Sequence, residues 1–226
     1  MKNIGLSLLL FLTLYFFQTS SLAILTAYAK EPSPQNMVFI LAGTFVSGPP
    51  SKPKSRYIDT FYIDRFEVTQ KDFEKVMNHN PSFFIGLERP AEKITWYDAK
   101  GYCEKVEKRL PTEWEWEKAV RGGTETLFFW GDEMDGDYAW DKSNANKQTQ
   151  PIGQKKPNAF GLHDMAGNVW EWTSSDHDNS GKVLRGGSWR NSSSSLRSAH
   201  RIGILPNQWF HYVGFRCALH EMMKSD

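Results

Sequence analysis

The stretch PNAFGLHDMAGNVWEWT, residues 157–173, places two carboxylates on either side of a glycine turn. Asp164 precedes the turn, and Glu171 lies between two tryptophans in the short strand expected after it. An acid buried among aromatic rings must be paired, protonated or bound to a metal ion. Two carboxylates together with carbonyl oxygens of the turn are the hard oxygen ligands that calcium takes. Because most acid pairs are simply solvated, the residues alone leave a calcium site and a solvated pair both open.

Other residues whose side chains could take part in catalysis or metal binding lie in RGGSWRNSSSSLRSAHR, residues 185–201. Its four consecutive serines lack a G-x-S-x-G elbow and a marked general base, which argues against a serine nucleophile. Histidines occur at positions 79, 163, 177, 200, 211 and 220, and a facial metal site would need two of them to converge with a carboxylate. Spacing along the chain does not test that convergence. Surface or hydrogen-bonded histidines are the simpler expectation.

The elements that must position these residues are short and of mixed type. Residues 37–48 predict a strand, a turn at Gly43-Thr44 and a second strand, and the alternation of apolar and polar residues within 57–68 predicts another strand. Helices are expected over 69–80, 95–108 and 112–122, the last beginning with a Thr-x-x-Glu capping box and closing at a glycine pair. The rest reads as glycine turns and short strands. This pattern predicts one domain of mixed helix and irregular sheet.

The N-terminal segment has the layout of a secretory signal peptide. Lys2 precedes an apolar stretch over 4–17, and an A-x-A cleavage site precedes Lys30. An uncleaved N-terminal anchor is the alternative. We therefore expect a signal peptide over 1–29 and a single domain over 30–226, periplasmic or secreted, with no stable membrane insertion if the signal peptide is cleaved.

Charge and cysteine content narrow the class of protein further. Lys and Arg number 27 against 26 Asp and Glu, a net charge of +1 without a basic stripe, so we expect no nucleic-acid partner. The chain has two cysteines, Cys103 and Cys217. In an oxidising compartment they predict one disulfide. A reactive thiol pair is the alternative, but the C-x-x-C spacing that lowers a thiol pKa is missing.

Four motifs in order carry a resemblance to a known family. They are KRLPTEWEWEKAVRGG at 108–123, PIGQKKPNAFGLHDMAGNVWEWT at 151–173, VLRGGSW at 183–189 and YVGFRCA at 212–218. Together they resemble the formylglycine-generating enzymes, also called sulfatase-modifying factors, over nearly the whole chain after the signal segment. The resemblance implies an α+β fold: a single irregular domain with little regular secondary structure, related to the C-type lectin-like fold.

The resemblance also implies a structural framework around the motifs. The family's disulfide corresponds to Cys103 and Cys217, in agreement with the bridge expected above. The family's structural calcium corresponds to Asp164, the backbone of Gly167 and Val169, and Glu171. Calcium is therefore the one cofactor that we expect.

The family's copper chemistry does not carry over to this sequence. In the enzymes, two cysteines shortly after the Gly-Gly-Ser turn hold copper(I), and without gaps those positions fall at Asn191 and Leu196. Copper(I) selects soft thiolate ligands, which amide and aliphatic side chains do not replace. We therefore expect no copper and no formylglycine generation by the family's mechanism.

The resemblance also implies a groove that takes an extended peptide. The groove residues would be Trp189, Arg190, Asn191, Arg197, His200, Arg201, Trp209, His211 and Tyr212. Arginine and large aromatic residues dominate recognition surfaces. Buried rings with arginines that merely solvate the rim are the alternative.

Two functions remain from the sequence. The first is an accessory protein that binds a peptide segment or an exported protein partner during that protein's maturation. The second is a periplasmic oxidoreductase of the same superfamily that uses chemistry without cysteine.

Overall fold

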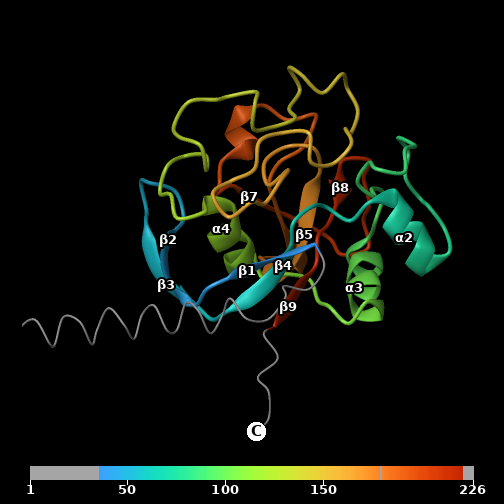
Figure 1. Ribbon diagram of the computed structural model, residues 1–226, viewed down its shortest axis with the longest axis horizontal. Coiled ribbons are helices and arrows are strands. Elements are labelled where there is room, and N and C mark those ends of the chain that lie inside the picture. The colour runs from blue at the N-terminus through green and yellow to red at the C-terminus, as the bar shows by residue number, and fades with distance from the viewer. Residues whose placement is uncertain (1–35, 179, 221–226) are drawn as a thin grey trace, which may run out of the picture. The chain divides into compact units, whose positions relative to one another are not determined.

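The computed structural model describes residues 36–178 and 180–220 (Figure 1). The signal peptide expected over 1–29 lies outside the described residues. The strands are β1 (Met37–Ile40), β2 (Gly43–Ser47), β3 (Lys54–Ile58), β4 (Phe61–Asp64), β5 (Trp170–His177), β6 (Gly181–Arg185), β7 (Arg201–Ile204), β8 (Val213–Gly214) and β9 (Ala218–His220). The helices are α2 (Gln70–Met77), α3 (Trp96–Lys105), α4 (Glu113–Arg121) and the 3-10 helix η1 (Ser193–Leu196).

The strands form two sheets and a hairpin. The largest sheet has the order β7-β6-β5-β8, and its β5–β8 pair is parallel. Glu171 of β5 lies opposite Arg185 of β6 on one side and Gly214 of β8 on the other. The second sheet has the order β1-β4-β9, and β2 pairs with β3. The central sheet therefore places three of the four motifs of the sequence side by side.

The helices lie on different sides of the central strand β5 (Figure 1). Helix α4 contacts the β2–β3 hairpin as well as β5 and β6, whereas α2 contacts α3, which in turn contacts β5. This arrangement confirms the expected α+β domain with little regular secondary structure. None of the helices in the described part of the chain has the length and apolar character needed to cross a bilayer.

The helix starts follow from capping, which the sequence predicts for the helix that begins after Thr112. Thr112 accepts a hydrogen bond from the amide of Glu115, and the Glu115 carboxylate accepts one from the amide of Thr112 at 2.8 Å. Thr95 forms the same capping box with Asp98 at the start of α3. Because each capping box satisfies two amides that the helix leaves unpaired, these short helices begin at defined residues.

One sequence prediction was wrong in detail. The alternating stretch 57–68 was expected to be one strand, but β3 ends at Ile58 and β4 begins at Phe61. The two pieces join different partners, β2 for the first and β1 with β9 for the second. Alternation of apolar and polar residues indicates only that one face of a strand is buried. It does not show which strand is the neighbour, so it does not reveal that β3 and β4 pair with different strands.

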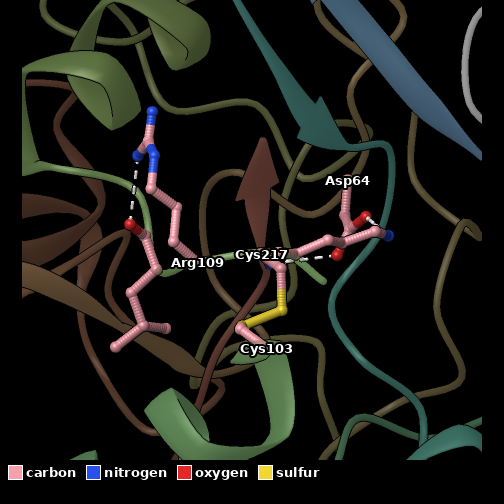
Figure 2. The surroundings of a disulfide bond; sticks show 6 residues. Asp64, Cys103, Arg109 and Cys217 are labelled. Carbon is pink, nitrogen blue, oxygen red and sulfur yellow. Dashed lines mark hydrogen bonds and ion pairs between the residues drawn. A yellow bond between two sulfur atoms is a disulfide. The ribbon is translucent and has the colours of Figure 1, made fainter. Parts of the chain in front are cut away.

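The two cysteines form the expected disulfide. Cys103 of α3 is bonded to Cys217, and their Cα atoms lie 5.7 Å apart. Figure 2 shows Asp64 beside this bridge, where its carboxylate accepts a hydrogen bond from the amide of Cys217 at 2.9 Å. The other oxygen of Asp64 accepts one from Lys108 at 2.6 Å. The bridge thus ties α3 to the chain entering β9 at a point that is already held by hydrogen bonds.

We predict that the double substitution Cys103→Ala and Cys217→Ala lowers the free energy of unfolding by about 4 kcal/mol, because the closed loop is long. The two cysteines are 114 residues apart in sequence. Urea denaturation followed by circular dichroism measures the difference between the oxidised protein and the variant. Wild type refolded in reducing agent is the matched control and should unfold with the variant. A loss below about 1 kcal/mol would contradict the stabilising role.

Candidate functional site

Glu171 lies at the buried centre of the structure and is hydrogen-bonded to an arginine and a tryptophan. Both of its oxygens accept hydrogen bonds from Arg216, from Nε at 2.7 Å and from Nη2 at 2.8 Å. Trp116 of α4 donates its indole N–H to the same carboxylate at 2.7 Å. Of the three ways to bury an acid, pairing with a cation is the one that this arrangement provides.

Two further carboxylates lie close to this pair. Asp164 is buried, and its Oδ2 accepts a hydrogen bond from the amide of Gly153 at 2.6 Å, whereas its Oδ1 has no hydrogen-bond partner among the described residues. Glu67 accepts the side-chain amide of Asn168 at 2.6 Å and thereby holds the turn before β5. Burial raises the pKa of Glu67 well above its usual value, and the charges of Asp164 and Glu171 raise it further. This centre therefore brings three acids together around the guanidinium of Arg216.

The residues expected to bind calcium fit a cation at this position. The unpartnered Oδ1 of Asp164 and the excess of carboxylates are features that a cation would satisfy. Glu171 supplies charge, and its Oε1 accepts a single hydrogen bond, which leaves a lone pair on that oxygen. Gly167 is required in the turn, because a Cβ there would collide with the carbonyl oxygen of Trp140.

A transition-metal site requires several His, Cys, Asp or Glu side chains to converge, whereas a calcium site can use backbone carbonyl oxygens. Among residues 36–178 and 180–220, no three or more His, Cys, Asp and Glu side chains group together to hold a metal ion. A calcium site made of two carboxylates and two backbone carbonyls does not need such a group. The convergence of histidines that an iron-type facial site requires is therefore missing from this part of the chain.

The positions that correspond to the copper cysteines have structural roles. Leu196 ends η1 and packs in the apolar core with 1% of its surface exposed. Asn191 accepts hydrogen bonds from the Trp170 indole at 2.9 Å and from the Ser188 hydroxyl at 2.6 Å. Since the only two cysteines of the sequence form the disulfide, no thiolate is available for copper(I).

Several of the expected groove residues surround His211. Its ring lies 5.6 Å from Trp189 and 5.5 Å from Tyr212, measured between ring centroids. Trp189 also donates its indole N–H to the His211 carbonyl at 3.3 Å. Arg190 places its guanidinium 4.5 Å above the Tyr212 ring. The segments before and after the serine run of the sequence thus meet at one aromatic group.

Two residues that the sequence analysis did not identify complete this group. The rings of Phe83 and Phe84 lie 5.7 Å and 5.8 Å from the His211 ring, and Phe84 packs edge-on against Trp189. We call Phe83, Phe84, Trp189, Arg190, His211 and Tyr212 the His211 cluster. Phe83 is 64% exposed although it is aromatic. The adjacent aromatic pair in a turn-forming NPSFF segment was the signal that could have identified it.

Buried polar side chains hold the Phe83–Phe84 loop in place. Glu92 Oε1 accepts the amide N–H groups of Phe83 and Phe84 at 2.6 Å and 2.8 Å. Gln70, at the start of α2, donates to the Phe84 carbonyl at 2.8 Å and accepts the amide of Gly86 at 3.1 Å. The exposed Phe83 ring is therefore presented by a loop that buried polar side chains hold in place.

The remaining expected groove residues are arranged differently. Arg201 forms an ion pair with Glu113 at 2.9 Å, on the side of the sheet that faces α4. The His200 ring lies 5.8 Å from Trp170. Burial, followed by the charges of Arg185 and Arg197, lowers the pKa of His200.

Trp209 and Arg197 are both exposed, and Trp209 is partnered by a residue that the sequence analysis missed. Lys93 lies 4.9 Å above the Trp209 ring. Burial, followed by the charges of Arg190 and Lys93, lowers the pKa of His211. The charge of Lys93 therefore reaches the His211 ring, as does the charge of Arg190 within the cluster.

We predict that Arg216→Met lowers the free energy of unfolding by about 3–5 kcal/mol, because it leaves a buried carboxylate without its cation. Adding Glu171→Gln should recover part of that loss. Urea denaturation in the presence of a chelator measures both. The control Lys182→Met removes an ion pair whose acid, Asp176, is 83% exposed, and should cost about 1 kcal/mol or less. Equal losses for Arg216→Met and the control would contradict the central role of the buried pair.

Comparison with known proteins places this geometry in a family. Residues 24–221 match the family described as Sulfatase-modifying factor enzyme 1-like domain. The chain is 32% identical over 219 residues to the chaperone protein LppX of Paenibacillus barcinonensis, covering 68% of this chain and 78% of that protein. It is 37% identical over 155 residues to the inactive C-alpha-formylglycine-generating enzyme 2 of Bos taurus, covering 58% of this chain and 50% of that protein.

Solved structures agree with this assignment. Treponema denticola variable protein 1 superposes with a TM-score of 0.76 and 29% identity, covering 82% of this chain and 95% of that chain. The motifs around Glu171, the disulfide and the fold thus lead to the same conclusion as the sequence match. The chain belongs to the formylglycine-generating enzyme, or sulfatase-modifying factor, family.

Proposed function

We propose that this protein is an exported accessory protein that binds a peptide segment of another exported protein during its maturation, without copper-dependent formylglycine generation. The observation that carries the proposal is the packing of the two side chains at the positions expected for the copper-binding cysteines. Leu196 is part of the apolar core, and Asn191 is hydrogen-bonded to Trp170 and Ser188. Side chains with these packing roles supply no ligand for copper(I).

The His211 cluster supports a binding role. It combines exposed aromatic surface, a guanidinium and a histidine on loops that buried hydrogen bonds hold in place. Such groups give large contact area and directed hydrogen bonds at little cost in conformational entropy. The names of two relatives, a chaperone and an inactive enzyme of the family, agree with a function that does not depend on catalysis. The proposal that the protein is exported rests on the signal-peptide pattern of residues 1–29.

We predict that residues 30–226, screened against a displayed library of random peptides, enrich sequences that bind saturably in fluorescence anisotropy. Phe83→Ser should weaken that binding about tenfold, because it removes an exposed aromatic contact. Tyr57→Ser on the β2–β3 hairpin is the matched control, since Tyr57 is 62% exposed and Phe83 64%. Equal effects of the two substitutions, or no enriched peptide, would contradict the proposal.

Metal analysis and oxygen uptake test the non-catalytic part of the same proposal. The purified protein should contain neither copper nor iron in stoichiometric amount and should consume no oxygen with a thiol-containing peptide. Stoichiometric copper or iron, or oxygen uptake that depends on the peptide, would instead support an oxidoreductase that uses chemistry without cysteine.

We also propose that the protein holds a structural calcium at Asp164, Gly167, Val169 and Glu171. Calcium at about 100 times its Kd should stabilise the fold by about 2.7 kcal/mol and raise Tm. Asp164→Gly should abolish that rise, and glycine tolerates the backbone there, since Asp164 has φ 55°. Asp137→Asn, which removes an exposed carboxylate, is the control and should keep the rise. A calcium response that survives Asp164→Gly would remove this site.

A further inference from the structure

Two cations at this surface, Arg190 of the His211 cluster and Lys93 next to it, have no acidic partner at ion-pair distance among residues 36–178 and 180–220. Arg190 lies above Tyr212 and Lys93 above Trp209, and both are close enough to His211 to lower the pKa of its ring. Within the described ranges, no carboxylate oxygen lies within 4.0 Å of a charged nitrogen of Lys93 or Arg190. These cations therefore leave local positive charge in a protein whose net charge is only +1.

The adjacent acid, Glu92, does not neutralise this surface. Its Oε1 is bound to the backbone amides of Phe83 and Phe84, beneath the aromatic loop, and the residue is fully buried. Burial raises the pKa of Glu92, although the two amide bonds and the charge of Lys93 oppose that rise. Glu92 thus positions the aromatic loop, and Lys93 has no anionic partner within 4.0 Å in the part of the chain that the structure describes.

Exposed apolar surface accompanies the two cations. Phe83 and Trp209 are 64% and 53% exposed, well above what large apolar side chains show in a core. A backbone hydrogen bond joins the segment of Lys93 to the segment that carries Trp209, because the amide of Lys93 donates to the carbonyl of Phe210 at 3.1 Å. Exposed aromatic rings next to unpaired cations favour a ligand that carries both apolar groups and negative charge.

A peptide satisfies this combination better than a polyanion does. Nucleic acid carries one charge for about every 1.7 Å of duplex and is bound by many lysines and arginines, whereas Lys93 and Arg190 are only two. An extended peptide presents every second side chain on the same face. It can therefore place apolar side chains on the rings and acidic side chains near the cations.

We infer that the His211 cluster, together with Lys93 and Trp209, binds an acidic peptide segment whose apolar side chains contact Phe83 and Trp209 and whose carboxylates pair with Lys93 and Arg190. The inference rests on the proposed peptide-binding function and adds the chemical class of the ligand. Binding of such a peptide weakens as the salt concentration rises, because the ion pairs that its carboxylates form with Lys93 and Arg190 are partly exposed to solvent.

The test uses a fluorescein-labelled peptide of alternating glutamate with leucine or phenylalanine, and matched peptides with glutamine or lysine in place of glutamate. Anisotropy at low and moderate salt should show that the glutamate peptide binds about tenfold more tightly than the glutamine peptide. Lys93→Glu with Arg190→Glu should weaken the glutamate peptide about tenfold while changing the glutamine peptide by about twofold or less. Lys52→Glu with Lys54→Glu makes the same change in net charge on the β2–β3 side and should alter neither affinity.

The outcomes separate this inference from the proposed function. If the glutamine or lysine peptide binds as tightly as the glutamate peptide, or if peptides from the library bind through Phe83 without acidic residues, the acidic preference is wrong and peptide binding stands. If both charge-reversed variants weaken the glutamate peptide equally, the effect is one of net charge and the inference is wrong. Binding of a single-stranded DNA or a heparin oligosaccharide with no binding of any peptide overturns both.

Discussion

The buried pair between Glu171 and Arg216 is the interaction on which the rest of the structure depends. Arg216 binds the carboxylate through two nitrogens and also donates to the backbone carbonyls of Asp64, Arg65 and His163. One guanidinium therefore joins β5, the end of β4 and the turn that carries Asp164. Removing a charge from water costs several kcal/mol, so this pair persists only because nearly all of its hydrogen-bonding groups are satisfied.

A second buried pair continues from the same sheet on the side of α4. Arg185 of β6 lies opposite Glu171 in the sheet and forms an ion pair with Glu117 of α4 at 2.5 Å. Glu117 also binds Arg121 at 2.9 Å, within the same helix. Buried charges in α4 therefore fix its position on the sheet through directional bonds. The segment after Arg185 then leaves the sheet in a defined direction, and this segment carries Trp189 and Asn191 into the candidate site.

The loop that the resemblance aligns with the copper site of the family is held by contacts within this chain. Asn191 and Leu196 make contacts that keep the loop folded without a metal, one by hydrogen bonds to Trp170 and Ser188 and the other by apolar packing. The buried ion pairs and the disulfide hold this fold through contacts that do not involve a metal ion.

The sequence by itself determined the helix starts at Thr95 and Thr112, the disulfide and the lack of thiolates for copper, because these depend on residue identity and on contacts within a few residues. It also located the turn and the two acids at Asp164 and Glu171. Only the tertiary structure decided that Glu171 pairs with Arg216, that the stretch 57–68 divides between two sheets, and that Phe83 and Phe84 meet His211. The physical reason is that these contacts join residues far apart in the chain, and a local pattern of polarity is compatible with many such pairings.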